Sequence, residues 1–140
     1  MPYVKYNANP LGNDDSVDCT VRAISLAVNV SWYSVYDDLA YFGRFMGDMP
    51  SANRVWKSYL KSMGFKEEQV ENTCPACQTV LRFAQQHPQG VYVLSTCEYQ
   101  VANGTRIATG SHVVTVIDGD YVDIFDSGLD VPLSYFCIRD

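Results

Sequence analysis

The sequence lacks a cluster of lysine and arginine residues, a long apolar run and a recognisable signal peptide. Its net charge is −6, so it does not offer the basic face of a non-specific nucleic-acid-binding protein. No stretch approaches the roughly 20 apolar residues that a membrane-spanning helix needs. Because the first residues, MPYVKYNANP, lack a basic region followed by an apolar run, we expect a cytoplasmic protein with no nucleic-acid or membrane partner.

The five cysteines are an odd set, which favours free thiols over a disulfide framework when no secretion signal is present. The segment CPAC at 74–77 has the spacing of a redox dithiol or of half a zinc site. However, no strand of a βαβ unit precedes it, and a zinc site would need Cys97, Cys137 or His87 to complete four ligands. Two idle thiols or a local disulfide are the simpler interpretation, and we expect no metal and no cofactor.

Apolar residues make up 47% of the 140 residues and aromatic residues 13%, which is typical of a folded globular protein. A chain of this length suffices for one hydrophobic core. No internal repeat, low-complexity tract or interdomain linker is visible. We therefore expect a single domain over residues 1–140.

The first half of the chain shows helical periodicity after a turn-rich lead-in over 1–16. A first helix is predicted from Val17, capped by Asp15 or Ser16, which puts Cys19 in its first turn. Further helices are expected after Ser31, from Pro50-Ser51 to Gly64, and from about 79 to 86, with a polar, irregular segment over 66–77. The expected buried faces are Val17, Val21, Ile24 and Val28; Trp32, Val35, Tyr36, Leu39 and Phe42; and Val55, Trp56, Tyr59, Leu60 and Met63.

The second half of the chain shows strands and hairpin turns. Strands are predicted at 91–94, 113–117, 121–125 and 131–138, with turns at Asn103-Gly104 and Asp118-Gly119. Helices first and strands second are typical of an α+β fold rather than of a βαβ repeat. The prediction is a set of N-terminal helices packed on a C-terminal antiparallel sheet.

Cys19 is a candidate nucleophile because the positive end of a helix lowers the pKa of a thiol below its free value of about 8.5. The backbone amides of the same helix start are also suited to binding an oxyanion. The alternative is that Cys19 is a small buried apolar residue. Asp18 opposes activation if its carboxylate approaches the sulfur, unless the loop turns it away.

His112 is the stronger of the two histidines as a general base. It precedes the β-branched run Val113 to Ile117, so a rigid strand would hold it at the edge of a sheet. The alternative is a structural histidine at a strand start. His87 lies at the end of the fourth predicted helix, where an imidazole is suited to capping carbonyl groups or facing water.

The hairpin over 112–126 brings two carboxylates back towards His112. A strict two-residue turn pairs Ile117 with Asp120 and leaves Asp123 diagonal to the histidine, whereas a longer loop or a bulge pairs His112 with Asp126. We prefer Asp126, because it ends the strand in the segment Asp-Ser-Gly, and we keep Asp123 as the second candidate.

The segments Asp18-Cys19-x-x-Arg22-Ala23-Ile24, Gly110-Ser111-His112-Val113-Val114-x-Val116 and Asp123-x-x-Asp126-Ser127 resemble, in order, the papain-like cysteine peptidases. The likeness is to the small bacterial branch that includes the peptidases that process bacteriocins after a double glycine. It extends over nearly the whole order of elements. Small proteins of bacteria and phages carry similar segments, so the cytoplasm is expected to be that of a bacterium or of an infected host cell.

This resemblance implies a papain-like fold and a Cys-His-Asp triad that cleaves a peptide or isopeptide bond through an acyl-enzyme, passed to water or to an amine. Asn13 occupies the position where the family has an amide side chain, usually glutamine, that helps form the oxyanion hole; Gln78 or backbone amides are the alternatives. The stretch 97–109 looks like an additional hairpin that partly covers the cleft. The expected partner is a protein or peptide substrate.

A second function class remains open, namely a non-catalytic binding protein on the same scaffold, such as a phage-encoded inhibitor of a host enzyme. Small size, an acidic surface and the lack of a secretion signal suit both classes. The presence of Cys19, His112 and Asp126 together favours the enzyme, because an inactive relative usually loses one of the three.

Overall fold

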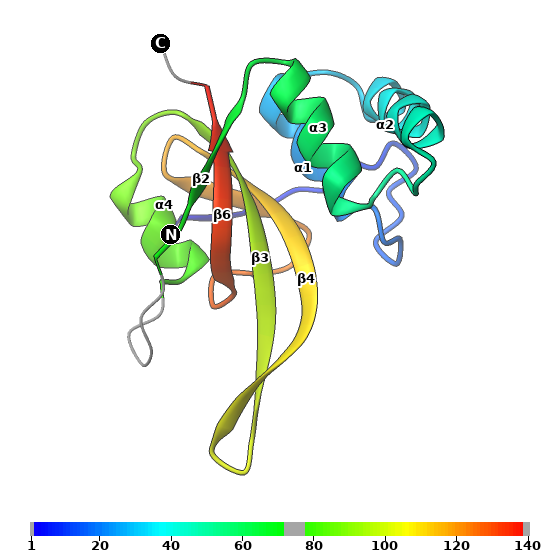
Figure 1. The fold of residues 1–140 in the computed structure, drawn as a ribbon. Helices are drawn as coiled ribbons and strands as arrows, with labels where there is room; N and C mark the ends of the chain where they lie inside the picture. Colours follow the sequence, from blue (N-terminus) through cyan, green and yellow to red (C-terminus); the bar gives the residue numbers. More distant parts are fainter. Residues whose placement is uncertain (1, 72–77, 139–140) are drawn as a thin grey trace.

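The computed structural model describes residues 2–71 and 78–138. This part of the chain forms four helices and one six-stranded sheet, an α+β arrangement (Figure 1). The helices are α1 (Cys19–Val28), α2 (Trp32–Met46), α3 (Asn53–Ser62) and α4 (Val80–Gln86). The strands are β1 (Tyr3–Lys5), β2 (Lys66–Gln69), β3 (Val91–Ala102), β4 (Thr105–Ile117), β5 (Asp120–Asp123) and β6 (Val131–Cys137).

The sheet is mixed rather than antiparallel, which corrects the sequence-based expectation. Its strand order is β1-β5-β4-β3-β6-β2, and β1 pairs with β5 in parallel while the other pairs are antiparallel. Both edge strands lie in segments that were expected to be irregular. β1 has only three residues and β2 is polar, so neither sequence carries a periodicity, and pairing with β5 and β6 is what makes them strands.

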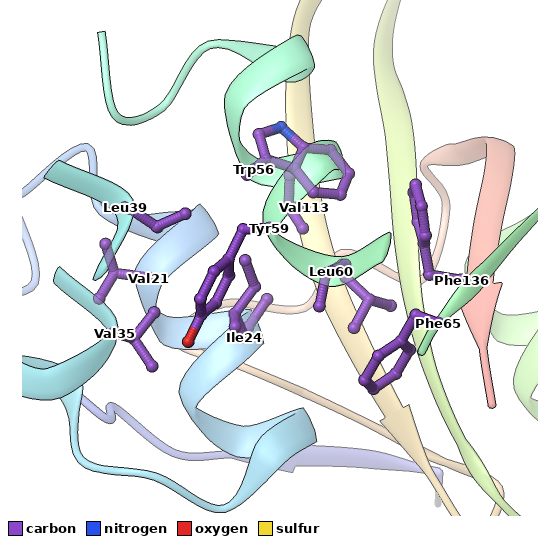
Figure 2. Packing of buried hydrophobic residues seen from close by; sticks show 12 residues of the cluster. Val21, Ile24, Val35, Leu39, Trp56, Tyr59, Leu60, Phe65, Val113 and Phe136 are labelled. Atoms are coloured by element: carbon purple, nitrogen blue, oxygen red, sulfur yellow. The ribbon is translucent and has the colours of Figure 1, made fainter. Parts of the chain in front are cut away.

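The two faces of the sheet are covered by different helices. Neighbouring residues alternate between the faces, because Val93 and Val113 pack with α1, α2 and α3 while Leu94 and Val114 pack with α4. Figure 2 shows the first cluster, in which Trp56 of α3 lies near Phe136 of β6, their ring centroids 5.4 Å apart. These contacts fix the start of α1 against β4.

The four helices lie close to where they were predicted, but three side chains that were expected to be buried are exposed. Ser31 caps α2 by accepting a hydrogen bond from the Ser34 backbone, and Val35, Leu39, Trp56 and Leu60 are buried as predicted. Val17 is 95% exposed, because α1 begins at Cys19 and leaves Val17 in the preceding loop. Tyr36 and Met63, also expected inside, are 47% and 39% exposed.

β3 and β4 form one long hairpin, with Asn103 and Gly104 at its turn in the left-handed region. The stretch 97–109 is therefore the far half of this hairpin rather than a separate one. In Figure 1 its end extends away from α1, α2 and α3.

Candidate active site

Cys19 is the first residue of α1, since Asp18 is the N-cap. The backbone N–H groups of a helix's first turn have no partners within the helix, and they carry its positive end. The Cys19 thiol is partly buried, and it lies close enough to the His112 side chain and to the Val113 backbone for both to lower its pKa. The thiol expected to act as nucleophile therefore lies against the histidine expected to act as base.

His112 is 5% exposed and joins the thiol to a carboxylate. Its Nε2 lies 2.6 Å from Oδ2 of Asp123, which leaves Nδ1 as the ring nitrogen available to the thiol. The Phe125 ring, 5.1 Å from the imidazole between centroids, packs beside it. His112 thus lies between the Cys19 thiol, which is close enough to change its pKa, and the Asp123 carboxylate, to which it is hydrogen-bonded.

The carboxylate on His112 belongs to Asp123 and not to Asp126, which corrects our preference. The β4–β5 turn has two residues, Asp118 (φ 49°) and Gly119 (φ 86°), and Ile117 pairs with Asp120. This is the strict register, so no extra residue moves Asp126 to the histidine. Asp126 instead accepts a hydrogen bond of 2.5 Å from the Tyr121 hydroxyl.

Asp123 is held by further partners. Its Oδ2 accepts a second hydrogen bond from the Ser127 hydroxyl (2.8 Å), and its Oδ1 accepts one from the Ile124 backbone (2.8 Å). Arg22 Nη2 lies 3.8 Å from the same Oδ1. Because the oxygens are fixed from several sides, Asp123 can hold the His112 ring in one orientation.

Asp18 is turned away from the sulfur. Its carboxylate forms an ion pair with Arg22 and accepts hydrogen bonds from the Asn9 amide (3.0 Å) and the Trp32 indole (2.9 Å). Asp18 and Arg22 are 7% and 5% exposed. Arg22 therefore lies between the carboxylates of Asp18 and Asp123 and offsets the charge of both, which removes the objection raised by the neighbouring aspartate.

The surroundings shift both functional pKa values towards an ion pair. Burial raises the pKa of the Cys19 thiol, but the hydrogen bond and charge of His112, the Val113 N–H and the charge of Arg22 outweigh it, so this pKa is lowered. Burial lowers the pKa of His112, but Asp123 and Cys19 outweigh it and raise this pKa to about 10. Both shifts favour a thiolate beside an imidazolium over a neutral thiol and imidazole.

A cavity of about 200 Å³ opens onto the thiol and the imidazole. Half of its lining consists of small polar side chains, namely Thr20, Ser51, Asn53, Ser95 and Ser111, and the other lining residues are Val17, Cys19, Trp56, His112 and Val113. Asn53 Oδ1 accepts a hydrogen bond of 3.0 Å from the Trp56 indole. An indole N–H only donates, so this contact identifies the oxygen and leaves the amide N–H groups of Asn53 free to donate elsewhere.

The two amide side chains suggested from sequence for the oxyanion hole are not among the residues that line this cavity. Asn13 is exposed and its Oδ1 accepts a hydrogen bond from the Asp15 backbone. Gln78 donates to Gln86 across α4. Asn53 was missed, because nothing in the sequence indicates that the start of α3 approaches the start of α1.

The remaining candidates lie elsewhere. Nδ1 of His87 lies 2.8 Å from the Phe83 carbonyl oxygen, the structural role expected of it. The CPAC segment falls outside the described residues, apart from which the chain contains no group of three His, Cys, Asp or Glu side chains that would hold a metal ion. Cys97 and Cys137 are free thiols.

Comparisons with known proteins identify no relative: no family model matches the chain, and neither does any curated protein or solved structure. Among the described helices, none combines the length and the apolar character needed to cross a membrane.

Proposed function

We propose that this protein is a papain-like cysteine hydrolase that cleaves amide bonds, with Cys19 as nucleophile, His112 as acid and base, and Asp123 as the orienting carboxylate. The observation that carries the proposal is the continuous contact from the Cys19 thiol through His112 to Asp123, at a helix start that borders a cavity. A cysteine that only fills space in a core does not need a histidine beside it that is in turn bound by a carboxylate.

The reaction begins when the Cys19 thiolate attacks the carbonyl carbon of the substrate and the carbonyl oxygen becomes an oxyanion. The Cys19 backbone N–H and the Asn53 amide are the donors suited to that oxyanion. His112 gives its proton to the departing amine, and an acyl-enzyme remains. His112 then takes a proton from water, the resulting hydroxide attacks the acyl group, and a carboxylic acid leaves with the thiolate restored. An amine in place of water would give transfer instead of hydrolysis.

A binding role has its own supporting observation. Tyr41 and Phe45 are 68% and 85% exposed, and a hollow of about 300 Å³ lies between α2 and α3 beside them. Large exposed apolar side chains that gather on one surface often mark a contact with another protein. This surface is compatible with the non-catalytic alternative, but the site at Cys19 has no part in it.

The described cysteines are free thiols, in keeping with the reducing cytoplasm, of a bacterium or of an infected host cell, in which we expect the enzyme to work.

The proposal is tested by acyl transfer from p-nitrophenyl acetate, which needs no knowledge of the natural substrate. We expect a burst of about one equivalent of p-nitrophenolate per protein, with the acetyl group found on Cys19 by peptide mapping. Cys19→Ser is the control and should abolish the burst. A burst that survives in Cys19→Ser, or acetyl groups spread evenly over Cys19, Cys97 and Cys137, would contradict the assignment.

A further inference from the structure

We infer that the substrate is a polypeptide and that one of its apolar side chains occupies a second hollow, here called the Trp32 pocket, next to the Cys19 cavity. This inference rests on the proposed function and extends it to the class of substrate. The Trp32 pocket has a volume of about 240 Å³ and is lined by Ser16, Val17, Asp18, Thr20, Val21, Trp32, Tyr36, Leu39, Pro50 and Ser51.

The Trp32 pocket and the Cys19 cavity adjoin each other, since Val17, Thr20 and Ser51 line both. Pockets for whole small-molecule ligands usually measure about 300 to 1,000 Å³. At about 240 and 200 Å³, each hollow is smaller than that range and is suited to one residue of a chain. Because the two hollows adjoin, a polypeptide that is cut at Cys19 can place a neighbouring side chain in the Trp32 pocket.

The walls of the Trp32 pocket select for an apolar side chain. Trp32 and Tyr36 stack with their ring centroids 5.2 Å apart and their planes at 16°. Buried Leu39 and Val21, together with Pro50, supply aliphatic surface. A side chain placed here would exchange water for aromatic and aliphatic contacts, which is favourable in proportion to the apolar area covered.

The one charged group in the lining does not select for a cation. Asp18 already has the Arg22 guanidinium, the Asn9 amide and the Trp32 indole as partners. A lysine or arginine in this pocket would lose its hydration without gaining an uncommitted carboxylate. The same indole bond fixes the Trp32 ring, so this wall is in place before the substrate arrives.

Val17 supports the path between the two hollows. It is 95% exposed although it is apolar, and it stands where the two linings meet. A chain that runs from the Trp32 pocket to Cys19 would cover it. The Cys19 cavity, in contrast, offers hydroxyl and amide groups suited to the main chain around the bond that is cut.

The inference is tested with a pooled library of synthetic peptides, whose cut sites are mapped by mass spectrometry on both sides of the bond. We expect wild-type protein to favour Leu, Met, Phe or Tyr by about tenfold at one position within three residues of the cut. Tyr36→Ala should largely remove that preference, and Tyr36→Glu should shift it towards Lys and Arg. Tyr33→Ala is the matched control and should leave it unchanged, because Tyr33 touches the Trp32 edge from the same helix but does not line the pocket.

Alkylation of Cys19 by iodoacetamide, measured on the same samples, separates a failure of the Trp32 pocket from a failure of the proposed hydrolase. Cuts with no apolar preference, or with the same preference in both Tyr36 variants, would overturn the Trp32 pocket and leave the hydrolase standing. A selectively reactive Cys19 with no cut peptide would overturn the polypeptide substrate. An ordinary Cys19 with no cut peptide would overturn both.

Discussion

The regions around His112 and His87 use the same side chain for different purposes. In both, one ring nitrogen makes a hydrogen bond: His112 with the Asp123 carboxylate at 2.6 Å, and His87 with the Phe83 carbonyl oxygen at 2.8 Å. The other neighbour of each imidazole ring differs more between the two regions. The His112 ring meets the Cys19 thiol, whereas the His87 ring stacks on Phe83 with centroids 3.8 Å apart.

Partner chemistry, and not the residue type, separates a base from a structural imidazole. A carboxylate and a thiol both stabilise the imidazolium form, so His112 can hold a proton at neutral pH. The Phe83 carbonyl oxygen and the Phe83 ring hold the His87 ring in place at the end of α4. Neither is a group that an imidazole could activate.

The largest predicted effect comes from exchanging the two histidines in turn for glutamine. His112→Gln should lower the rate of acyl transfer to Cys19 by about 10⁴-fold or more, as loss of a catalytic base does in comparable triads. His87→Gln should change it by less than about threefold, because that ring touches no reacting group. Burst kinetics with p-nitrophenyl acetate measures both, and equal losses would remove the distinction between the two regions.

The carboxylates offer a second comparison with a smaller expected effect. Asp123→Asn should lower acyl transfer by about 10³- to 10⁴-fold, because an amide no longer stabilises the imidazolium or holds the correct tautomer. Asp126→Asn keeps an acceptor for Tyr121 and should stay within about threefold of wild type. Thermal unfolding is the check on folding. A greater loss in Asp126→Asn would restore the sequence-based preference.

Asn53 can be tested by comparing two reactions of the same thiol. Acyl transfer forms an oxyanion, whereas alkylation by iodoacetamide does not, so loss of an oxyanion donor should slow only the first. We expect Asn53→Ala and Asn53→Asp to reduce the ratio of acylation to alkylation by about 10- to 100-fold.

Asn53→Asp is the more informative variant, because it keeps an acceptor for the Trp56 indole and removes the donor. Alkylation is followed over the whole pH range, so that a changed thiol pKa is separated from a changed limiting rate. If the ratio stays at the wild-type value in both variants, Asn53 serves only to satisfy Trp56.

The smallest predicted effect concerns stability and pH. The folded pKa of His112 is raised, from 6.5 to about 10, so its contribution is complete below pH 6.5 and is lost as pH rises towards 10. The folded pKa of Cys19 is lowered from 9.0, so its contribution is present above pH 9 and is lost as pH falls. Between pH 6.5 and 9 the two contributions change with pH in opposite directions, so their slopes oppose each other.

Removing the thiol should expose the slope of the histidine. In Cys19→Ala, Asp123 still raises the pKa of His112, so the unfolding free energy should fall from pH 7 to 8 by up to about 1.4 kcal/mol relative to wild type. Asp130, whose pKa burial raises to about 6, titrates below this window. Urea unfolding at each pH measures the slope, with Cys97→Ala as control. Parallel curves for wild type and Cys19→Ala would show that the two groups do not share a proton.

Local patterns predicted much of the fold and part of the site. Apolar periodicity located the four helices, and the turn signals Asn-Gly and Asp-Gly located both hairpins. Cys19 followed from a helix start, which is a local feature. His112 was chosen as the start of a strand at a sheet edge, which is wrong, because it lies inside β4 (Thr105–Ile117) and β4 is an interior strand of the sheet. The edge strands β1 and β2 could not be found this way, since three residues are too few for a pattern in β1, β2 is polar, and both become strands by pairing.

The misassigned residues depend on long-range geometry. The choice between Asp123 and Asp126 turned on a single residue of turn length, which the sequence left open. Asn53 reaches the Cys19 cavity only because α3 packs beside α1, and no local pattern reports that. Val17 was assigned to the core because α1 was expected to begin two residues before it does.

The most direct test of the central claim is alkylation by iodoacetamide from pH 5 to 9, with peptide mapping of Cys19, Cys97 and Cys137. We predict that Cys19 alone reacts rapidly near pH 6, and that in His112→Gln its reaction requires the higher pH of an ordinary thiol. If Cys19 follows the same pH profile as Cys97 and Cys137, no thiolate–imidazolium pair exists and the proposed hydrolase is wrong.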